Sequence, residues 1–464
     1  MTVRAPAPRA TTARAARRAP ADLPFTFADR GLAQALAAER GEPGWLRDER
    51  LAAVSAFEGL PTESNQLYTP YIDLRAADLF GVRPYVTTAT APAAGHAPVP
   101  AGTSGIIELR EDGIGALSLS SAARDAGVVL ETFGAALQRD EATFREELLA
   151  GHLPADDKLA QLARGFWSQG IRLVVPDGVA LDEPFVLRWS GGVAGRALLS
   201  RTIVHLGAKA RAGIVEELLG PSDRVTGEGD QALFGGTLEV DLGAGAQLNV
   251  ASIQDFPSNL VLFQHRHARI GDGASLRWAL AQLGSRLVRS RVDNVLSGDR
   301  STVEQVEIVF GGESQLFDLT SYTRHVGRDT TGNLLSKGVL LDASRAYMKG
   351  MITIDKTAIG TDSFLGEFGM NLSKKARSVA IPSLEIDQPD CRRAAHSSSV
   401  GPIDEAQLFY LESRGIPPDE ARKFIVLGFL EPVVARVPLE AERDRLRALL
   451  EEKWNAGRAA TAAA

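Results

Sequence analysis

The residues of this chain that could do chemistry gather in one stretch near the C-terminus. His396 lies there, five positions after Cys391, the only cysteine, and directly before the small residues Ser-Ser-Ser-Val-Gly at 397–401. Neutral imidazole is a ligand for iron, and small neighbours would let the ring approach another surface closely. From these residues alone, His396 is either a metal ligand or a histidine that caps the end of a domain.

Other combinations of residues offer less chemistry. His265 and His267 lie two apart in a strand-like run and therefore on one face, where they could hold a metal or form an exposed ladder with Arg266 and Arg269. We favour the ladder, because no third ligand is indicated nearby. The sequence contains no GxxxxGK[ST] phosphate loop, no His/Glu zinc spacing and no nucleophile elbow. We therefore expect that the chain does not hydrolyse ATP itself.

Composition narrows the class of protein. Of the 464 residues, 44% are hydrophobic and 23% are charged, as in ordinary globular proteins, and the net charge of −7 gives no reason to expect nucleic acid as a partner. One cysteine excludes an internal disulfide and a cysteine-only iron–sulfur or zinc site. It also suits a reducing compartment. No apolar run reaches the roughly 20 residues that cross a bilayer, so no membrane is expected.

Two apolar helices are predicted after the polar stretch. Asp404 suits the N-cap of the first, which should end near Arg414 with Gly415 in a left-handed conformation. Pro417 and Pro418 suit the start of the second. Both carry more apolar surface than a short exposed helix needs, so each should bury it against this chain or another. The apolar residues are Leu408, Phe409, Tyr410, Leu411, Phe424, Ile425, Leu427, Phe429 and Leu430.

Upstream, the sequence predicts a repetitive β fold. From Gly170 onward the apolar period changes from 3.6 to 2, in many short runs. Similar turns recur at Gly207, Gly243, Gly271 and Gly298, separated by 36, 28 and 27 residues. This rough period favours a mainly β protein built on a right-handed parallel β-helix, with glycine where the turns need positive φ. A β-sandwich is the alternative, and flanking helical regions should cap the two ends of the β-helix.

The predicted organisation has five parts. These are a disordered tail at 1–22, a mainly helical region at 23–169, a β-helix core at 170–400, a C-terminal helical domain at 401–455 and a frayed tail at 456–464. The first segment has five arginines and no acid before Asp22, so an organelle transit peptide is the alternative for it. We expect a cytoplasmic protein, or one of the organelle stroma or matrix if 1–22 is a transit peptide.

Several motifs resemble the SufB/SufD family of iron–sulfur cluster assembly proteins. The order is His396, Ser-Ser-Ser-Val-Gly, Asp404-Glu405, Leu-Phe-Tyr-Leu at 408–411, Ser-Arg-Gly-Ile-Pro at 413–417, and Gly-Phe at 428–429. The upstream run 334–386 is also similar to that family. The resemblance is strong from about 324 to 438 and is pattern-level from about 44 to 324. It is closer to the SufD branch than to the SufB branch.

The resemblance implies a site and partners. In the SufD branch, the histidine before this small-residue turn lies at the interface with SufB, where a nascent cluster is thought to form, and His396 matches it. The family often has a cysteine two positions before this histidine; Ala394 stands there in this chain, which weakens Cys391 as a ligand. The C-terminal helices of the family bind the ABC-type ATPase SufC. The residues that would contact it or frame its groove are Phe409, Tyr410, Arg414, Phe424 and Phe429.

Three classes of function remain open. The first is a non-catalytic scaffold subunit of a SufB–SufC–SufD-type complex, with an iron–sulfur cluster held transiently at a subunit interface; the family's complex has also been linked to reduced flavin. The second is a β-solenoid enzyme, which would need clustered catalytic groups on one face. The third is a SufB-like scaffold that holds the cluster itself, which should carry more cysteines. We favour the first.

Overall fold

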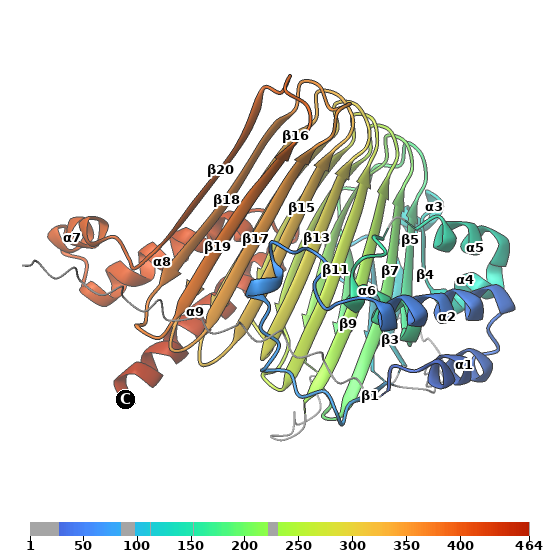
Figure 1. Ribbon diagram of the computed structural model, residues 1–464, viewed down its shortest axis with the longest axis horizontal. Helices are drawn as coiled ribbons and strands as arrows, with labels where there is room; N and C mark the ends of the chain where they lie inside the picture. Colours follow the sequence, from blue (N-terminus) through green and yellow to red (C-terminus); the bar gives the residue numbers. More distant parts are fainter. Residues whose placement is uncertain (1–26, 85–97, 112, 152, 221–230, 464) are drawn as a thin grey trace, which may run out of the picture.

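The centre of the molecule is a parallel β-solenoid of about eight turns (Figure 1). The computed structural model describes residues 27–84, 98–111, 113–151, 153–220 and 231–463. Each turn contributes one strand to each of two facing sheets. Within a sheet, the strands of successive turns pair in parallel. The predicted parallel β-helix is therefore confirmed, and the hairpin-built sandwich is not found.

The two sheets are named here the first sheet and the second sheet. The first sheet has the order β4 (Val129–Thr132), β5 (Gln169–Val175), β7 (Arg196–Leu206), β9 (Ala232–Leu242), β11 (Leu260–Ile270), β13 (Leu287–Leu296), β15 (Leu316–His325), β17 (Arg345–Ile354), β19 (Arg377–Ile386), and β1 (Arg83–Pro84) pairs with β7. The second sheet has the order β3 (Gly113–Leu119), β2 (Gly105–Arg110), β6 (Phe185–Ser190), β8 (Arg211–Leu219), β10 (Gln247–Asp255), β12 (Ser275–Gln282), β14 (Thr302–Gly311), β16 (Thr331–Leu340), β18 (Asp362–Asn371), β20 (Arg393–Gly401).

The period of two in the sequence sets the interior of the solenoid. Alternate residues of both sheets face inward and form one continuous apolar core, which large rings such as Trp189, Phe234 and Trp278 fill in its first half. The sheets come closer towards the last turn. A Cβ added at Gly350 would lie 2.9 Å from Oε1 of Glu367, across the interior. Small residues therefore fit this end of the core.

The turn glycines have two roles, of which one was predicted. The positive φ angles lie two positions later, at Lys209, Gly245, Gly273 and Arg300. At Gly243, Gly271 and Gly298 an added Cβ would instead collide with the backbone of the preceding coil. These three glycines are required because successive coils touch at the turns, whereas the predicted use of glycine at positive φ is confirmed at Gly245 and Gly273.

The N-terminal helices cover the outer face of the first sheet (Figure 1). Leu36, Val54 and Phe166 of these helices pack on outward-facing side chains of β7, β9 and β11, such as Leu199 and Phe263. The elements are α1 (Arg30–Glu39), α2 (Gly44–Gly59), η1 (Thr69–Tyr71), α4 (Phe133–Arg139), α5 (Glu141–Leu149) and α6 (Lys158–Phe166). Helix α3 (Ser121–Asp125) instead contributes Ala123 to the interior core.

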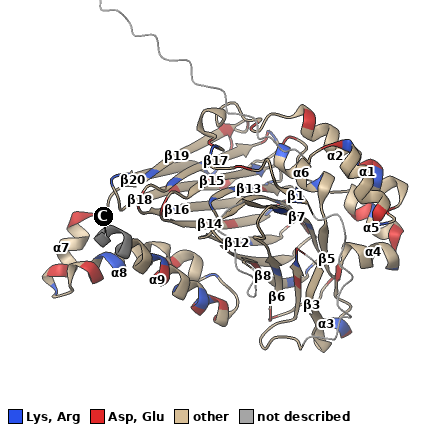
Figure 2. Cartoon of the chain, turned by 90° about the horizontal axis from the view of Figure 1, so that it is seen from below, with Lys and Arg blue, Asp and Glu red and all other residues tan. Residues whose placement is uncertain are grey.

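The C-terminal helices cover the outer face of the second sheet. They are α7 (Glu405–Ser413), α8 (Pro418–Val434) and α9 (Glu440–Ala463). Val426, Leu430 and Leu446 pack on outward-facing residues of β10, β12 and β14, such as Ile253 and Ile308. Figure 2 shows α8 and α9 lying along this layer, while α7 projects beyond it. Both helical regions therefore cover sheet faces, where caps on the ends were expected; the outward apolar columns supply the surface that the helices bury.

Two predicted boundaries differ from the structure. Strands β2, β3 and β4 join the sheets before residue 170, within the region predicted as mainly helical. Helix α9 continues to Ala463, through the predicted frayed tail, and Ala456, Ala459 and Ala460 are strong helix formers. The tail at 1–22 lies outside the described residues. Among the helices of the described part, none has the length and apolar composition needed to cross a bilayer.

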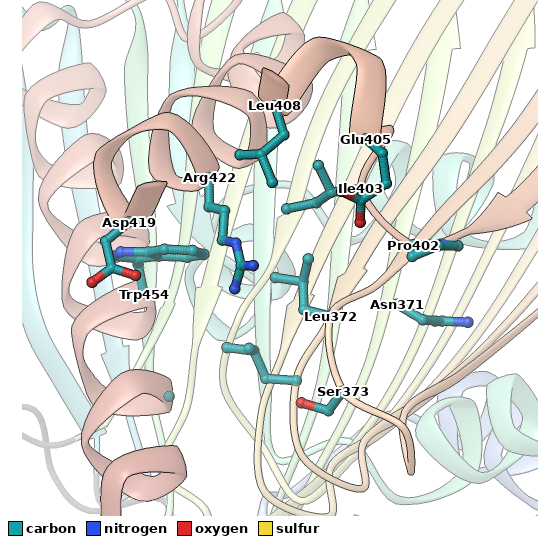
Figure 3. A pocket seen from close by; sticks show the side chains of 12 residues that line it. Asn371, Leu372, Ser373, Pro402, Ile403, Glu405, Leu408, Asp419, Arg422 and Trp454 are labelled. Carbon is teal, nitrogen blue, oxygen red and sulfur yellow. The ribbon is translucent and has the colours of Figure 1, made fainter. Parts of the chain in front are cut away.

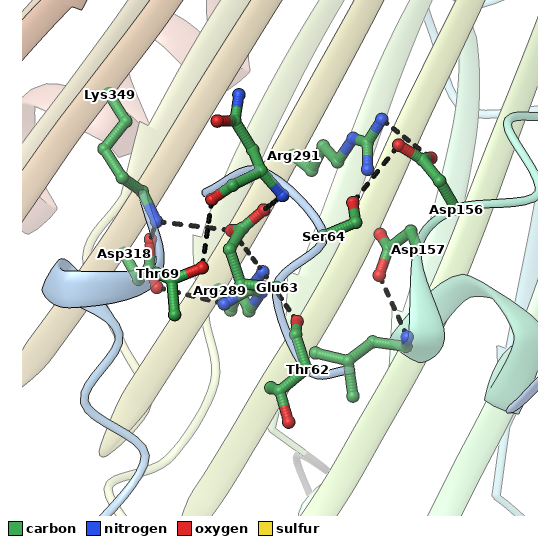
Figure 4. A network of polar contacts seen from close by, with 12 residues as sticks. Thr62, Glu63, Ser64, Thr69, Asp156, Asp157, Arg289, Arg291, Asp318 and Lys349 are labelled. Atoms are coloured by element: carbon green, nitrogen blue, oxygen red, sulfur yellow. Dashed lines mark hydrogen bonds and ion pairs between the residues drawn. The ribbon is translucent and has the colours of Figure 1, made fainter. Parts of the chain in front are cut away.

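A buried charge network fixes an N-terminal segment to the first sheet (Figure 4). Nη2 of Arg289 lies 2.9 Å from Oε2 of Glu63, and Nη1 lies 3.3 Å from Oδ2 of Asp318. Arg289 also donates to the carbonyl of Thr62 at 3.1 Å. Moving this segment away from the sheet would leave the buried Arg289 without one of its carboxylate partners, which is energetically costly, so the network holds the segment in place.

Candidate functional site

His396 lies on the last strand of the second sheet. β20 spans Arg393–Gly401 and pairs with β18, so the small residues at 397–401 continue a strand. The predicted turn at 397–401 is therefore wrong. Serine runs are typical of turns, but here Ser398 provides a small inward-facing side chain at the narrow end of the solenoid, and Ser397 and Ser399 face outward.

The register places His396 on the inward side of an open end. His396 pairs with Leu365 of β18, which pairs with Leu334 of β16, and both leucines are buried in the interior. Side chains of paired residues in a parallel sheet point the same way, so the imidazole stacks above Leu365. No described strand pairs with the other edge of β20 or of β19, and His396 is exposed. We call this surface, formed by β19 and β20, the open end.

The open end offers a metal one ligand rather than a complete site. Within the described residues, no three His, Cys, Asp or Glu side chains are arranged to hold a metal ion. On β20, His396 is followed by Ser397, Ser398 and Ser399, which are also exposed. An imidazole in this position can complete a coordination sphere whose other ligands come from a second chain.

Cys391 lies in the connection between β19 and β20. Its side chain is half-buried and packs against a small apolar cluster that includes Ile352, Ile354 and Leu365. Leu365 is also the residue below His396. The thiol and the imidazole therefore border the same cluster, and the role of Cys391 as a ligand stays a prediction.

The helices after the open end expose aromatic side chains. Phe409 and Tyr410 of α7 are 72% and 57% exposed, and Phe424 of α8 is 61% exposed. The Arg414 guanidinium lies 5.3 Å from the centre of the Tyr410 ring. Exposed aromatic and arginine side chains gathered on two helices are typical of a protein-binding surface. We call Phe409, Tyr410, Arg414 and Phe424 the aromatic surface.

Phe429 is placed differently from the other predicted contact residues. Its ring lies 4.5 Å from Nζ of Lys337 on β16, and its carbonyl accepts a hydrogen bond of 3.0 Å from the same ammonium. The side chain is half-buried between α8 and the second sheet. Phe429 thus holds α8 on the solenoid and borders a groove that Phe424 also lines.

The start of the helical domain follows the sequence signals. Asp404 accepts a hydrogen bond from the Ala406 amide, and Gly415 has φ +84° after the end of α7. Pro417 and Pro418 begin α8. Of α7, only Leu408 is buried, so this helix rests on α8 through one apolar contact region. A pocket of about 480 Å³ lies beneath it, lined by Leu372, Ile403, Leu408, Arg422 and Trp454 among others (Figure 3).

The histidine pair on β11 is neither an exposed ladder nor a metal site. His265 is buried, with Nδ1 2.9 Å from Oδ2 of Asp157 and Nε2 2.8 Å from Oδ2 of Asp293. Burial alone would lower the pKa of His265, but Asp293 and Asp157 outweigh it and the pKa is raised. Asp157 is the N-cap of α6, so His265 connects this helix to the sheet. The prediction of an exposed ladder was wrong, because the sequence does not show that α6 covers β11.

Comparisons with known proteins agree with the architecture. Residues 189–429 match the family model described as SUF system FeS cluster assembly, SufBD core domain. An iron–sulfur cluster assembly SufBD family protein of Staphylococcus epidermidis is 25% identical over 448 residues, which cover 92% of this chain and 94% of the relative. One of Staphylococcus saprophyticus is 26% identical over 324 residues, covering 69% and 68% of the two chains. This chain therefore belongs to the SufBD family of iron–sulfur cluster assembly proteins.

Proposed function

We propose that this chain is a SufD-like, non-catalytic scaffold subunit of a complex that assembles iron–sulfur clusters. In this proposal the open end pairs with a SufB-like subunit, and His396 supplies one ligand to a cluster that is passed on as cargo. The position of His396 carries the proposal: an exposed imidazole on the last coil, at an edge with no strand partner among the described residues. Unpaired edges of this kind are templates for pairing with another chain.

The proposal assigns the aromatic surface to an ABC-type ATPase of the SufC class. Phe409 and Tyr410 are exposed on α7, which projects from the solenoid (Figure 1). The sequence has no phosphate-binding loop, which fits a subunit that receives ATP-driven movement from a partner. Participation of reduced flavin in the complex stays a prediction, as does a cytoplasmic location.

Two alternative functions predict different behaviour of the purified protein. A SufB-like scaffold would hold a cluster by itself, whereas one cysteine and, among the described residues, one exposed histidine are few ligands for that role. A β-solenoid enzyme would act without either partner. We expect the chain alone to be nearly colourless and a co-expressed complex with SufB-like and SufC-like subunits to be brown. A brown chain purified alone would favour the SufB-like role.

The ATPase contact has a matched test. Phe409→Asp combined with Phe424→Asp should abolish co-purification of the SufC-like subunit, because two charges would enter an apolar interface. Phe80→Asp is the control, since Phe80 is 63% exposed but lies in the N-terminal region. A pull-down compares the three proteins after circular dichroism has confirmed their folding. Full retention of the ATPase by the double variant would contradict the assignment of this surface.

A further inference from the structure

A line of polar residues crosses the apolar interior of the solenoid. The strand register of the second sheet places seven inward-facing residues side by side, one on each of seven successive coils: Glu216, Ser252, Leu280, Glu307, Ser336, Glu367 and Ser398. Except at Leu280, the line alternates carboxyl and hydroxyl side chains. We call it the polar column. Its last member, Ser398, lies two positions from His396 on the same side of β20, at the open end.

The polar column is deeply buried. Glu307 and Glu367 are 0% and 1% exposed, and Ser336 between them is 4% exposed. Burying a polar group without full hydrogen bonding costs roughly 1–3 kcal/mol in proteins. The neighbouring inward-facing lines mix apolar residues, such as Leu334 and Val309, with amides, and Nε2 of Gln282 donates a hydrogen bond of 3.0 Å to Oε1 of Glu307. Leu280 occupies one position of the polar column itself, so an apolar residue fits this line sterically, and the line needs a physical reason beyond packing.

Arg266 spans the interruption at Leu280 from the opposite sheet. Its Nη2 donates to Oε2 of Glu216 at 2.6 Å and to Oγ of Ser252 at 2.9 Å. Its charge also acts on Glu307. The ion pair neutralises Glu216, so the first half of the column holds matched charges inside the core.

Several buried polar atoms around this point have no hydrogen-bond partner among the described residues. The donors are Nε and Nη1 of Arg266, and the acceptors are Oε1 of Gln264 and Oε1 of Gln282. Hydrogen-bond donors of the first sheet and acceptors of both sheets thus lie near one another without partners among the described residues. Water both donates and accepts, and buried waters typically bind to about three such groups. A simple anion or cation would satisfy only one of the two kinds of atom.

In the second half of the column, burial favours the protonated form of the carboxyl groups. Oε2 of Glu367 accepts a hydrogen bond of 2.7 Å from the Ile381 amide of β19. Burial raises the pKa of Glu307, and raises that of Glu367 to about 8, so Glu367 carries its proton at pH 7. A neutral carboxyl group both donates and accepts hydrogen bonds, as the hydroxyl groups of Ser336 and Ser398 do.

We propose that the polar column binds ordered water and conducts protons between the interior of the solenoid and the open end. The proton moves along hydrogen bonds: each carboxyl or hydroxyl oxygen receives one proton as it passes another on, so no oxidant or co-reactant is needed. The path runs from Glu307 through Ser336 and Glu367 to Ser398, which is exposed.

The use of such a path rests on the function proposed above. Thiols and sulfide lose their protons when they bind iron, so protons are released where a cluster forms. The column ends beside His396, the residue assigned to that place. Proton conduction itself is a property of the isolated chain and can be tested without partners or iron. Failure of one proposal is therefore distinguishable from failure of the other.

Infrared spectroscopy of the full-length chain tests the column. The C=O stretching band of a protonated carboxyl group is assigned by its loss in Glu307→Gln and Glu367→Gln, which keep the side-chain shape. After transfer into D2O at pH 7, both bands should shift much faster than the most protected core amides exchange. Ser336→Ala should slow the shift of the Glu307 band by about tenfold or more, since its route to the open end is cut, and leave the Glu367 band unchanged.

Ser321→Ala is the matched control. Ser321 is a buried serine of β15 that accepts a hydrogen bond of 2.7 Å from Gln305 outside the column, and its loss should alter neither band. The proposal is overturned if Glu307 and Glu367 show no protonated band, if their protons exchange only as slowly as the core amides, or if Ser336→Ala has no more effect than Ser321→Ala. Should a variant fail to fold, the wild-type comparison between carboxyl and amide exchange still decides.

Discussion

At the residue scale, close contact between coils explains the glycines of the turns better than backbone freedom does. An added Cβ at Gly298 would overlap the backbone amide of Asp272 in the preceding coil, whereas Gly273, with φ +61°, has nothing within 4 Å of an added Cβ. These two positions separate the two roles of glycine. The sequence showed the spacing of the glycines, but the contact between coils exists only after the chain has wound.

Substituting these two glycines should have unequal effects. Gly298→Ala should destabilise the fold by about 3 kcal/mol, because the coils must move apart. Gly273→Ala should cost about 1 kcal/mol, the strain of a left-handed alanine. Thermal unfolding and soluble yield of the two variants provide the comparison. An equal loss of stability in both would show that positive φ, and not contact between coils, sets the requirement.

Predictions at His396 illustrate what can be inferred from residue types. Its exposure among small residues was foreseen, but its strand was not, because a run of serines has no apolar alternation to mark a strand. The inward position of Glu367 could not be predicted from the sequence for a related reason. A lone acid in Gly-Glu-Phe reads as a surface residue, and only the register with Ser336 and Ser398 shows that it faces inward.

At the scale of elements, α6 is fixed to the first sheet by a histidine that lies between two carboxylates. His265 contacts Asp157, the N-cap of α6, and Asp293 of β13, and Arg291 lies 2.9 Å from the same Asp293 carboxylate. The pKa of His265 is raised, while the pKa values of Asp157 and Asp293 are held below their usual range despite burial, which would raise them. The helix and the sheet therefore depend on each other's charges.

The contribution of His265 should depend on pH in a defined direction. A group whose pKa is raised on folding stabilises fully below its unfolded pKa, near 6.5, and the contribution is lost as pH rises through the folded value. His265→Gln should thus lower the protection of α6 by about 3 kcal/mol at pH 6, and by less at higher pH. Hydrogen exchange of residues 158–166 measures this. A difference between wild type and variant that grows with pH would contradict the charged state assigned to His265.

The placement of the helices shows where sequence reasoning ends. Caps and breakers predicted α7 and α8 correctly at Asp404, Gly415 and Pro418. Whether an apolar helix caps an end or covers a face depends on which outward columns are apolar, such as Ile253 and Ile308 on the second sheet. In the linear sequence, the outward-facing residues alternate with inward-facing ones that are also apolar, so the sequence does not show which face a helix covers. The aromatic surface stayed exposed because only one side of each helix is used.

At the scale of the whole molecule, the two ends of the solenoid differ in how their edge strands are paired. Antiparallel strands β3 and β4 close the sheets at the N-terminal end, whereas β19 and β20 leave the other end open (Figure 1). Helices cover both broad faces and leave the open end and α7 exposed. The solenoid class followed from the period of two and from the spacing of the turn glycines. The unequal ends did not, because strand pairing at an edge depends on the whole chain.

The central claim is that His396 at the open end takes part in holding a nascent cluster. It is tested by iron and acid-labile sulfide content of the complex co-expressed with SufB-like and SufC-like subunits. His396→Ala should lower both by about tenfold or more without changing subunit ratios, since a direct ligand is lost and the edge is kept. Ser397→Ala, adjacent on β20 but in register with Gly366 on the outward side, should leave both unchanged. Unaltered iron and sulfide in an intact His396→Ala complex would contradict the account.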